Sequence, residues 1–189
     1  MKFLWVPVLL ASPAAAQGLI DYDLLMAQNA DRVVVQTDSA GRETRVLDMG
    51  DGVTVTCDAE GCVGMDMTDK GALGCTFSIV TELRAFAEVC NCPLTEAESA
   101  ALTDGFDRIG AVVAANAVPP RPASFPHEVL ETTRNRLRAG LGADPVAACA
   151  AEAEGDVGQM LRAIVQGWQA GEGKVDPADS RLPVMNPCL

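Results

Sequence analysis

The spacing of apolar residues changes once along this chain, from a period of two residues to the period of an α-helix. The alternation is clearest where Val53, Val55 and Cys57 are separated by threonines, as in a strand with one buried face. From residue 76 onward, apolar residues recur every three or four positions, which is typical of amphipathic helices. Because strands precede helices instead of alternating with them, we predict an α+β protein and not a doubly wound parallel sheet.

The predicted architecture is a small antiparallel β-meander packed against a helical C-terminal part and cross-linked by disulfides. We expect one domain over residues 17–189, which is β-rich over 31–68 and helical over 75–170, with an extended tail over 171–189. The predicted strands are 32–37, 44–49, 53–57 and 62–67. The predicted helices are 20–30, 76–90, 125–139 and three more that begin near Thr95, Asp144 and Asp156. Thr95 and Glu98 have the spacing of a capping box, which predicts where the longest helix begins.

The N-terminus predicts export from the cytoplasm. Lys2 is followed by a run of nine mostly apolar residues, 3–11, and then by the small residues Ala14 to Ala16. This is the pattern of a signal peptide over residues 1–16, with cleavage between Ala16 and Gln17. Nine helical residues reach about 14 Å, whereas a membrane span must cross about 30 Å. We therefore expect a periplasmic or secreted protein whose mature chain has no transmembrane segment.

All seven cysteines lie in the predicted mature chain, and an oxidising compartment favours disulfides between them; they are Cys57, Cys62, Cys75, Cys90, Cys92, Cys149 and Cys188. An odd number leaves at least one cysteine unpaired within the chain. Cys57 and Cys62 flank a predicted four-residue turn, so they are expected to bond across a hairpin. A bridge to Cys188 would hold the C-terminal tail in place, and its partner is expected among Cys90, Cys92 and Cys149.

Two groups of residues offer a thiol or soft-metal chemistry. Cys90 and Cys92 are two positions apart at a predicted helix end, where they can form a redox pair or bind a soft metal. The alternative is that each is a structural cysteine bonded to a distant partner. Met65 and Met67, near Cys62 and Asp66, present the thioether and thiolate ligands that suit Cu(I).

Strand alternation opposes that copper site, because it places Met65 and Met67 on the same face as Val63, where core residues are expected. The spacing of Asp66, Asp69 and Gly71 only partly resembles a calcium loop, since the closing Glu is absent. We therefore expect no metal site and no cofactor.

Histidine chemistry is limited by the single histidine, His127, at the start of a predicted helix. A Ser-His-Asp hydrolase would have to use it, and no Gly-x-Ser-x-Gly motif accompanies it. A zinc-peptidase His-x-x-x-His pair requires two histidines. We therefore expect no catalytic residue and interpret His127 as an exposed helix-start residue.

The formal charge of −12 opposes nucleic-acid binding, which needs a basic stripe. The leading hypothesis is an exported, non-catalytic protein that binds a protein partner or contributes to the cell envelope. One alternative is a thiol-redox or soft-metal-binding protein that uses Cys90 and Cys92. Another is a carboxylate-based hydrolase, because the chain has 26 acidic residues and such enzymes need only two.

Overall fold

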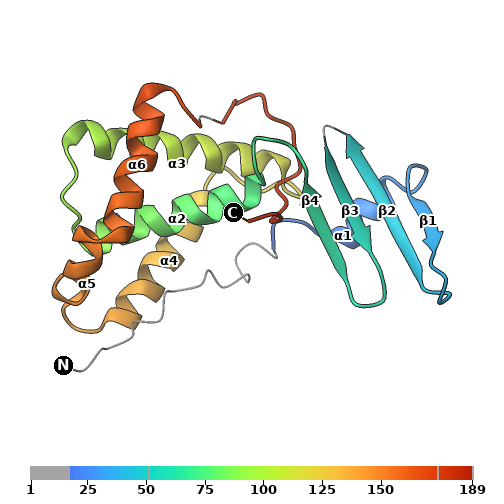
Figure 1. The fold of residues 1–189 in the computed structure, drawn as a ribbon, viewed down its shortest axis with the longest axis horizontal. Helices are drawn as coiled ribbons and strands as arrows, with labels where there is room; N and C mark the ends of the chain where they lie inside the picture. Colours follow the sequence, from blue (N-terminus) through green and yellow to red (C-terminus); the bar gives the residue numbers. More distant parts are fainter. Residues whose placement is uncertain (1–17, 51, 174, 189) are drawn as a thin grey trace.

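The computed structural model describes residues 18–50, 52–173 and 175–188, and the α+β class predicted from the sequence is confirmed (Figure 1). A short helix precedes a four-stranded sheet, and five longer helices follow it. The elements in chain order are α1 (Tyr22–Gln28), β1 (Val34–Thr37), β2 (Glu43–Gly50), β3 (Val53–Cys57), β4 (Cys62–Asp66), α2 (Leu73–Val89), α3 (Glu96–Asn116), α4 (Phe125–Leu141), α5 (Pro145–Glu154) and α6 (Asp156–Ala170). The predicted signal peptide over residues 1–16 lies outside the described residues.

The sheet is the predicted antiparallel meander, with its strands side by side in the order β1-β2-β3-β4. Strands β1 and β3 are rich in Val and Thr, whose branched side chains suit a pleated, half-buried surface. At the first hairpin, Oδ1 of Asp38 accepts hydrogen bonds from the backbone N–H groups of Ala40 (2.8 Å) and Arg42 (3.0 Å). This carboxylate fixes the turn and, with it, the register of β1 against β2.

The buried face of β4 is opposite to the one predicted. Val63 is 42% exposed and Met67 is 73% exposed, whereas Gly64 and Asp66 are buried. A Cβ atom on Gly64 would overlap Val184 and approach the hydroxyl of Tyr22, so the C-terminal tail and α1 cover this side of the sheet. The prediction was wrong because alternation gives the two faces of a strand, but the tail decides which of them is buried.

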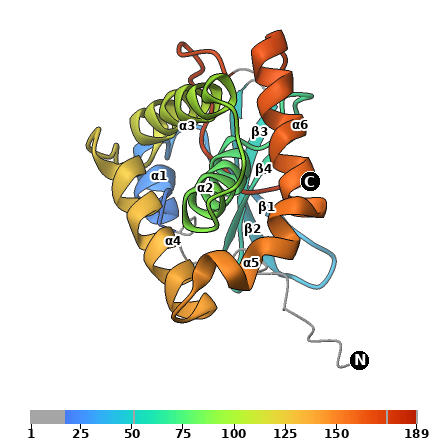
Figure 2. The ribbon, with the colours of Figure 1, turned by 90° about the vertical axis from the view of Figure 1, so that its left-hand side faces the viewer.

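Helix α2 is the centre of the helical part. Figure 2 shows it between α3, α4 and α6, with α5 across its lower end. Its buried positions cover most of its surface, as a central helix requires. The capping box predicted for α3 is present: the backbone N–H of Glu98 donates to Oγ1 of Thr95, and the Glu98 carboxylate accepts from the backbone N–H of Thr95.

Part of the C-terminal tail belongs to the core. Leu182 and Val184 are 5% and 0% exposed, respectively. The backbone N–H of Gly74 donates to the carbonyl of Val184 (2.9 Å), and that of Asp66 donates to the carbonyl of Asn186 (2.7 Å). The tail therefore joins the start of α2 to the edge of β4, and buried residues of the sheet, the helices and the tail form one apolar cluster.

Candidate functional site

Three disulfides cross-link the described residues: Cys57–Cys62, Cys75–Cys188 and Cys90–Cys149. Cys57 and Cys62 are cross-strand partners with their Cα atoms 4.0 Å apart, as the hairpin spacing predicts. The predicted partner of Cys188 was wrong. The tail passes the first turn of α2, which carries Cys75, whereas Cys90 caps the other end of the same helix about 22 Å away.

The Cys90-Asn91-Cys92 motif does not form a bond within itself. Cys90, the C-cap residue of α2, bonds to Cys149 on α5 with a Cα–Cα distance of 5.8 Å. Cys92 is free and half-buried. Burial raises the pKa of the Cys92 thiol, and the nearby positive charge of Arg162 offsets part of that effect. A raised pKa leaves less thiolate at neutral pH, so this environment reduces the reactivity of Cys92.

A thiol titration of the oxidised protein should therefore detect one thiol per chain. We expect Cys92 to react slowly with Ellman's reagent in the native protein and rapidly after denaturation, because it is half-buried and its pKa is raised. The native rate should increase as the pH rises toward the pKa. Rapid native labelling at neutral pH would contradict the assignment, and a Cys92→Ser variant, which should give no signal, is the control.

The four residues of the hypothetical copper site do not converge. The Cys62 sulfur is bonded to Cys57 and offers no thiolate ligand, and Asp66 points to the buried side of the sheet. Met65 is half-buried on the opposite face of β4, and Met67 lies beyond the strand in an exposed position. Within the described ranges, no three His, Cys, Asp or Glu side chains are grouped closely enough to hold a metal ion.

A buried ion-pair cluster is the feature that sequence reasoning missed. The Arg181 guanidinium donates to the Asp66 carboxylate at 2.5 Å, to the Thr68 hydroxyl at 2.9 Å and to the Gly71 carbonyl at 3.0 Å. It also donates to both carboxylate oxygens of Asp179. The other carboxylate oxygen of Asp66 accepts from the backbone N–H and the hydroxyl of Thr68, so both oxygens have partners. The cluster fixes the tail to the end of β4.

His127 lies in the first turn of α4 and is exposed, as predicted. Its Nε2 atom is 3.7 Å from a carboxylate oxygen of Asp107 on α3, and its ring packs against Phe106 with centroids 5.7 Å apart. The same Asp107 accepts a hydrogen bond from Arg84 of α2 at 3.2 Å, and Arg84 covers the Phe106 ring. His127 is thus part of a surface contact between three helices.

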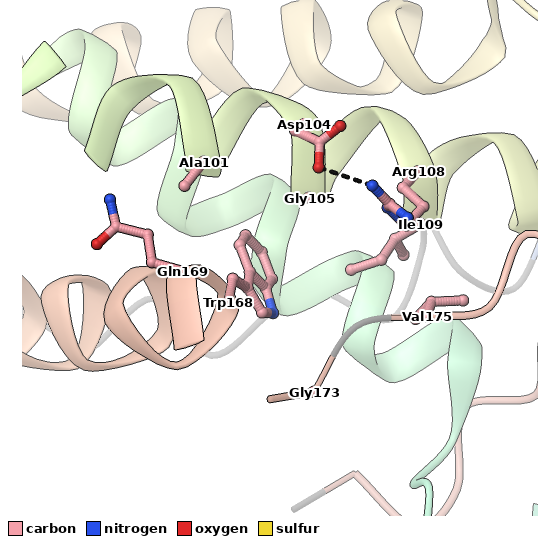
Figure 3. Close-up of a pocket in the computed structure, with 9 residues that line it drawn as sticks. All are labelled: Ala101, Asp104, Gly105, Arg108, Ile109, Trp168, Gln169, Gly173 and Val175. Carbon is pink, nitrogen blue, oxygen red and sulfur yellow. Dashed lines mark hydrogen bonds and ion pairs between the residues drawn. The ribbon is translucent and has the colours of Figure 1, made fainter. Parts of the chain in front are cut away.

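A small pocket lies between α3, α6 and the following chain (Figure 3). The Trp168 indole, Ile109 and Val175 form its apolar wall, and the Asp104–Arg108 ion pair (2.9 Å) lines it from α3. Its volume is about 110 Å³. Ligand sites for small molecules usually measure roughly 300–1,000 Å³, so this pocket is too small for most metabolites.

Gly105 makes this helix contact possible and provides a test of it. A Cβ atom at this position would overlap the Trp168 ring. We expect Gly105→Ala to lower the free energy of unfolding by about 1–3 kcal/mol, because a rigid ring must move. Gly140→Ala in α4 is the matched control: its Cβ meets nothing within 4 Å, so it should stabilise by about 0.5–1 kcal/mol. Urea unfolding followed by tryptophan fluorescence measures both, and equal effects would contradict the contact.

The outer face of the sheet, meaning the side opposite α1 and the tail, is the candidate binding surface. Cross-strand pairing places Val34, Val46, Thr56 and Val63 in one row across all four strands. Val34 and Val63 are 57% and 42% exposed, respectively. The residues that flank the row on the same face are Gln36, Thr44, Asp48, Thr54 and Met65, of which Asp48 is charged and exposed. A row of branched side chains on a disulfide-linked sheet is a flat, weakly polar surface suited to protein contact.

No helix among the described residues is long and apolar enough to cross a membrane. No protein-family model matches this chain, and no curated protein or solved structure matches it either. The candidate surface is therefore interpreted from its own geometry.

Proposed function

We propose that the chain is an exported, non-catalytic protein that binds another protein through the outer face of its sheet. The observation that carries this proposal is the row of Val34, Val46, Thr56 and Val63, in which Val34 and Val63 are exposed and Val46 and Thr56 are half-buried. Because the row carries no charge, it fits a partner protein whose contacting surface is also uncharged. Water released from the branched side chains would favour the contact.

The rigidity of the sheet supports a binding role. The Cys57–Cys62 disulfide joins β3 to β4, and the buried Asp66–Arg181 pair holds the end of β4 to the tail. A surface held in one conformation loses little entropy when a partner binds. Residues that suggested other chemistry have structural contacts instead: Cys90 bonds to Cys149, and Asp66 is bound by Arg181.

Export agrees with the disulfides, which are typical of oxidising compartments. We propose cleavage after Ala16 and a periplasmic or secreted mature protein consisting of a single domain over residues 17–189. N-terminal sequencing of protein from the native envelope and from the culture medium tests this. A sequence beginning at Gln17 would support the proposal, whereas a retained Met1 would contradict it.

The binding role is tested by comparing two matched double variants in capture from the native envelope fraction. Val34→Glu with Val63→Glu places charge on the outer face. Val146→Glu with Met160→Glu places the same charge on α5 and α6, where these residues are 46% and 51% exposed. The amount of partner captured should fall at least about tenfold with the first variant, relative to wild type, and should be unchanged with the second. Equal retention or equal loss would overturn the proposal.

A thiol-redox function remains the second candidate, because Cys92 is free and two residues from the Cys90–Cys149 disulfide. The two functions give different results with Cys92→Ser. A redox protein loses its activity as a thiol reductant in this variant, whereas a binding protein retains its partner.

A further inference from the structure

The two edges of the sheet differ in whether another segment covers them. The edge of β4 is occupied by the tail, where Met65 and Asn186 form a parallel bridge. Among the residues that the structure describes, no strand pairs with the outer edge of β1, and all four residues of β1 are exposed. Figure 1 shows β1 at the end of the sheet farthest from helices α2 to α6. An open edge presents unpaired backbone N–H and C=O groups that another strand can pair with.

The hairpin register identifies which backbone groups are free. The N–H of Asp38 donates to the carbonyl of Arg42 at 3.0 Å, at the end of the ladder in which Val34 opposes Val46. Hydrogen-bonded pairs alternate along an antiparallel ladder. Even-numbered residues of β1 therefore bond to β2, and the N–H and C=O groups of Val35 and Thr37 point outward.

We propose that β1 pairs antiparallel with β1 of a second copy of this chain, around a twofold axis at Val35. In this register, Val35 faces Val35 of the second copy, and Val33 faces Thr37. These are odd-numbered residues, so their free backbone groups oppose each other. The exception is the Val33 N–H, which donates to the Asn29 carbonyl of its own chain at 3.2 Å, so Val33 pairs through its carbonyl alone. A twofold contact is self-complementary, which makes a second copy a natural partner for this edge.

Charge complementarity selects this register. With the axis at Val35, Arg32 faces Asp38 of the second copy at both ends of the paired strands, where it adds to the ion pair that Asp38 makes with Arg42 of its own chain (2.7 Å). Arg32 precedes and Asp38 follows the uncharged segment Val-Val-Val-Gln-Thr. As even-numbered positions, they form a pair without backbone hydrogen bonds, in which side chains lie closest. Moving the axis by one residue in either direction leaves Arg32 and Asp38 opposite uncharged residues.

The sequence of β1 does not protect this edge against pairing. Natural sheets block open edges with proline, lysine or a bulge, and the segment over residues 33–37 contains none of these. The irregularity of the sheet lies between β2 and β3 instead. Pairing would produce one continuous sheet of eight strands, with the outer faces of both copies on the same side.

Sedimentation velocity of the mature, oxidised protein up to about 1 mM tests the proposal. Wild type should dimerise, and Val35→Glu and Val35→Lys should each weaken the dimer at least about tenfold, because like charges then meet at the axis. Mixing these two variants should restore a dimer, because opposite charges then face each other. Val146→Glu, with a residue 46% exposed on α5, is the control and should dimerise like wild type.

A monomeric wild type would overturn the proposal, as would two monomeric variants that fail to associate on mixing. Circular dichroism of each variant separates these outcomes from unfolding. The inference does not rest on the proposed function: a dimer without a captured partner removes only the binding role, and a captured partner with a monomeric wild type removes only the dimer.

Discussion

Arg181→Met is expected to lower the free energy of unfolding by about 3–5 kcal/mol, one of the two largest effects in this molecule. The Arg181 and Asp66 side chains are 6% and 0% exposed, so the substitution leaves a buried carboxylate without its counter-ion. Breaking one partner of a buried ion pair typically costs this much. It also removes the hydrogen bonds from Arg181 to Thr68 and to the Gly71 carbonyl. Urea unfolding of the oxidised protein measures the change.

Two further variants separate burial from charge. Adding Asp66→Asn to Arg181→Met removes the unpaired carboxylate, so part of the lost stability should return. Arg42→Met breaks an exposed pair, in which the side chains of Arg42 and Asp38 are 80% and 38% exposed, and should cost much less than Arg181→Met. If Arg181→Met cost no more than Arg42→Met, the buried cluster would not hold the tail.

The pH dependence of the same variant provides a second measurement. Burial tends to raise the pKa of Asp179, but hydrogen bonds from Arg181 outweigh it and hold the pKa below its ordinary value. A lowered folded pKa contributes stability that is fully present above the unfolded value of about 4 and is lost as the pH falls through the folded pKa. Arg181→Met should therefore show a weaker loss of stability on acidification than wild type.

The strands and helices could be predicted because their signals are local. The alternation of Val53, Val55 and Cys57 and the capping box at Thr95 each depend on residues a few positions apart. Tight turns then restrict neighbouring strands to an antiparallel meander. The Cys57–Cys62 bond follows from the same short-range geometry.

The arrangement of the tail could not be predicted in this way. Asp66 and Arg181 are separated by 115 positions, and neither residue has a local pattern that marks it as buried. Because the tail packs against β4 and the start of α2, the buried face of β4 and the partner of Cys188 both differ from the predicted ones. One signal was available: Gly64 lies inside a strand, where glycine often marks the close approach of another segment.

The candidate surface could be predicted only in part, because local patterns give the strands but not the way they combine. Valine and threonine in alternating positions predict a sheet with two different faces, but they do not identify the exposed one. The row of Val34, Val46, Thr56 and Val63 emerges only when all four strands are in register. The open edge at β1 likewise depends on where the tail ends, because the tail occupies β4 instead.

Loss of the Cys75–Cys188 disulfide should destabilise the protein by about 5 kcal/mol. The bond joins residues 113 positions apart, and the chain-entropy model assigns the largest stabilisation to such long loops. Cys75→Ala with Cys188→Ser removes both sulfur atoms and avoids a new free thiol. In its absence, the tail is still held by the backbone bonds of Val184 and Asn186, the buried side chains of Leu182 and Val184, and the Arg181 cluster. Urea unfolding measures the stability, and tryptic cleavage after Arg181 should become faster.

Cys57→Ala with Cys62→Ala is the matched control, because this disulfide closes a loop with a separation of only 5 positions. The same model predicts a loss of about 2 kcal/mol, and cleavage after Arg181 should remain slow because the tail is still tied to α2. Equal losses from the two variants would contradict the role of loop length. A large loss without faster cleavage would show that the Arg181 cluster and the buried tail residues keep the tail docked. Adding Asp66→Asn, which weakens the cluster and leaves the trypsin site at Arg181 in place, should then make cleavage faster.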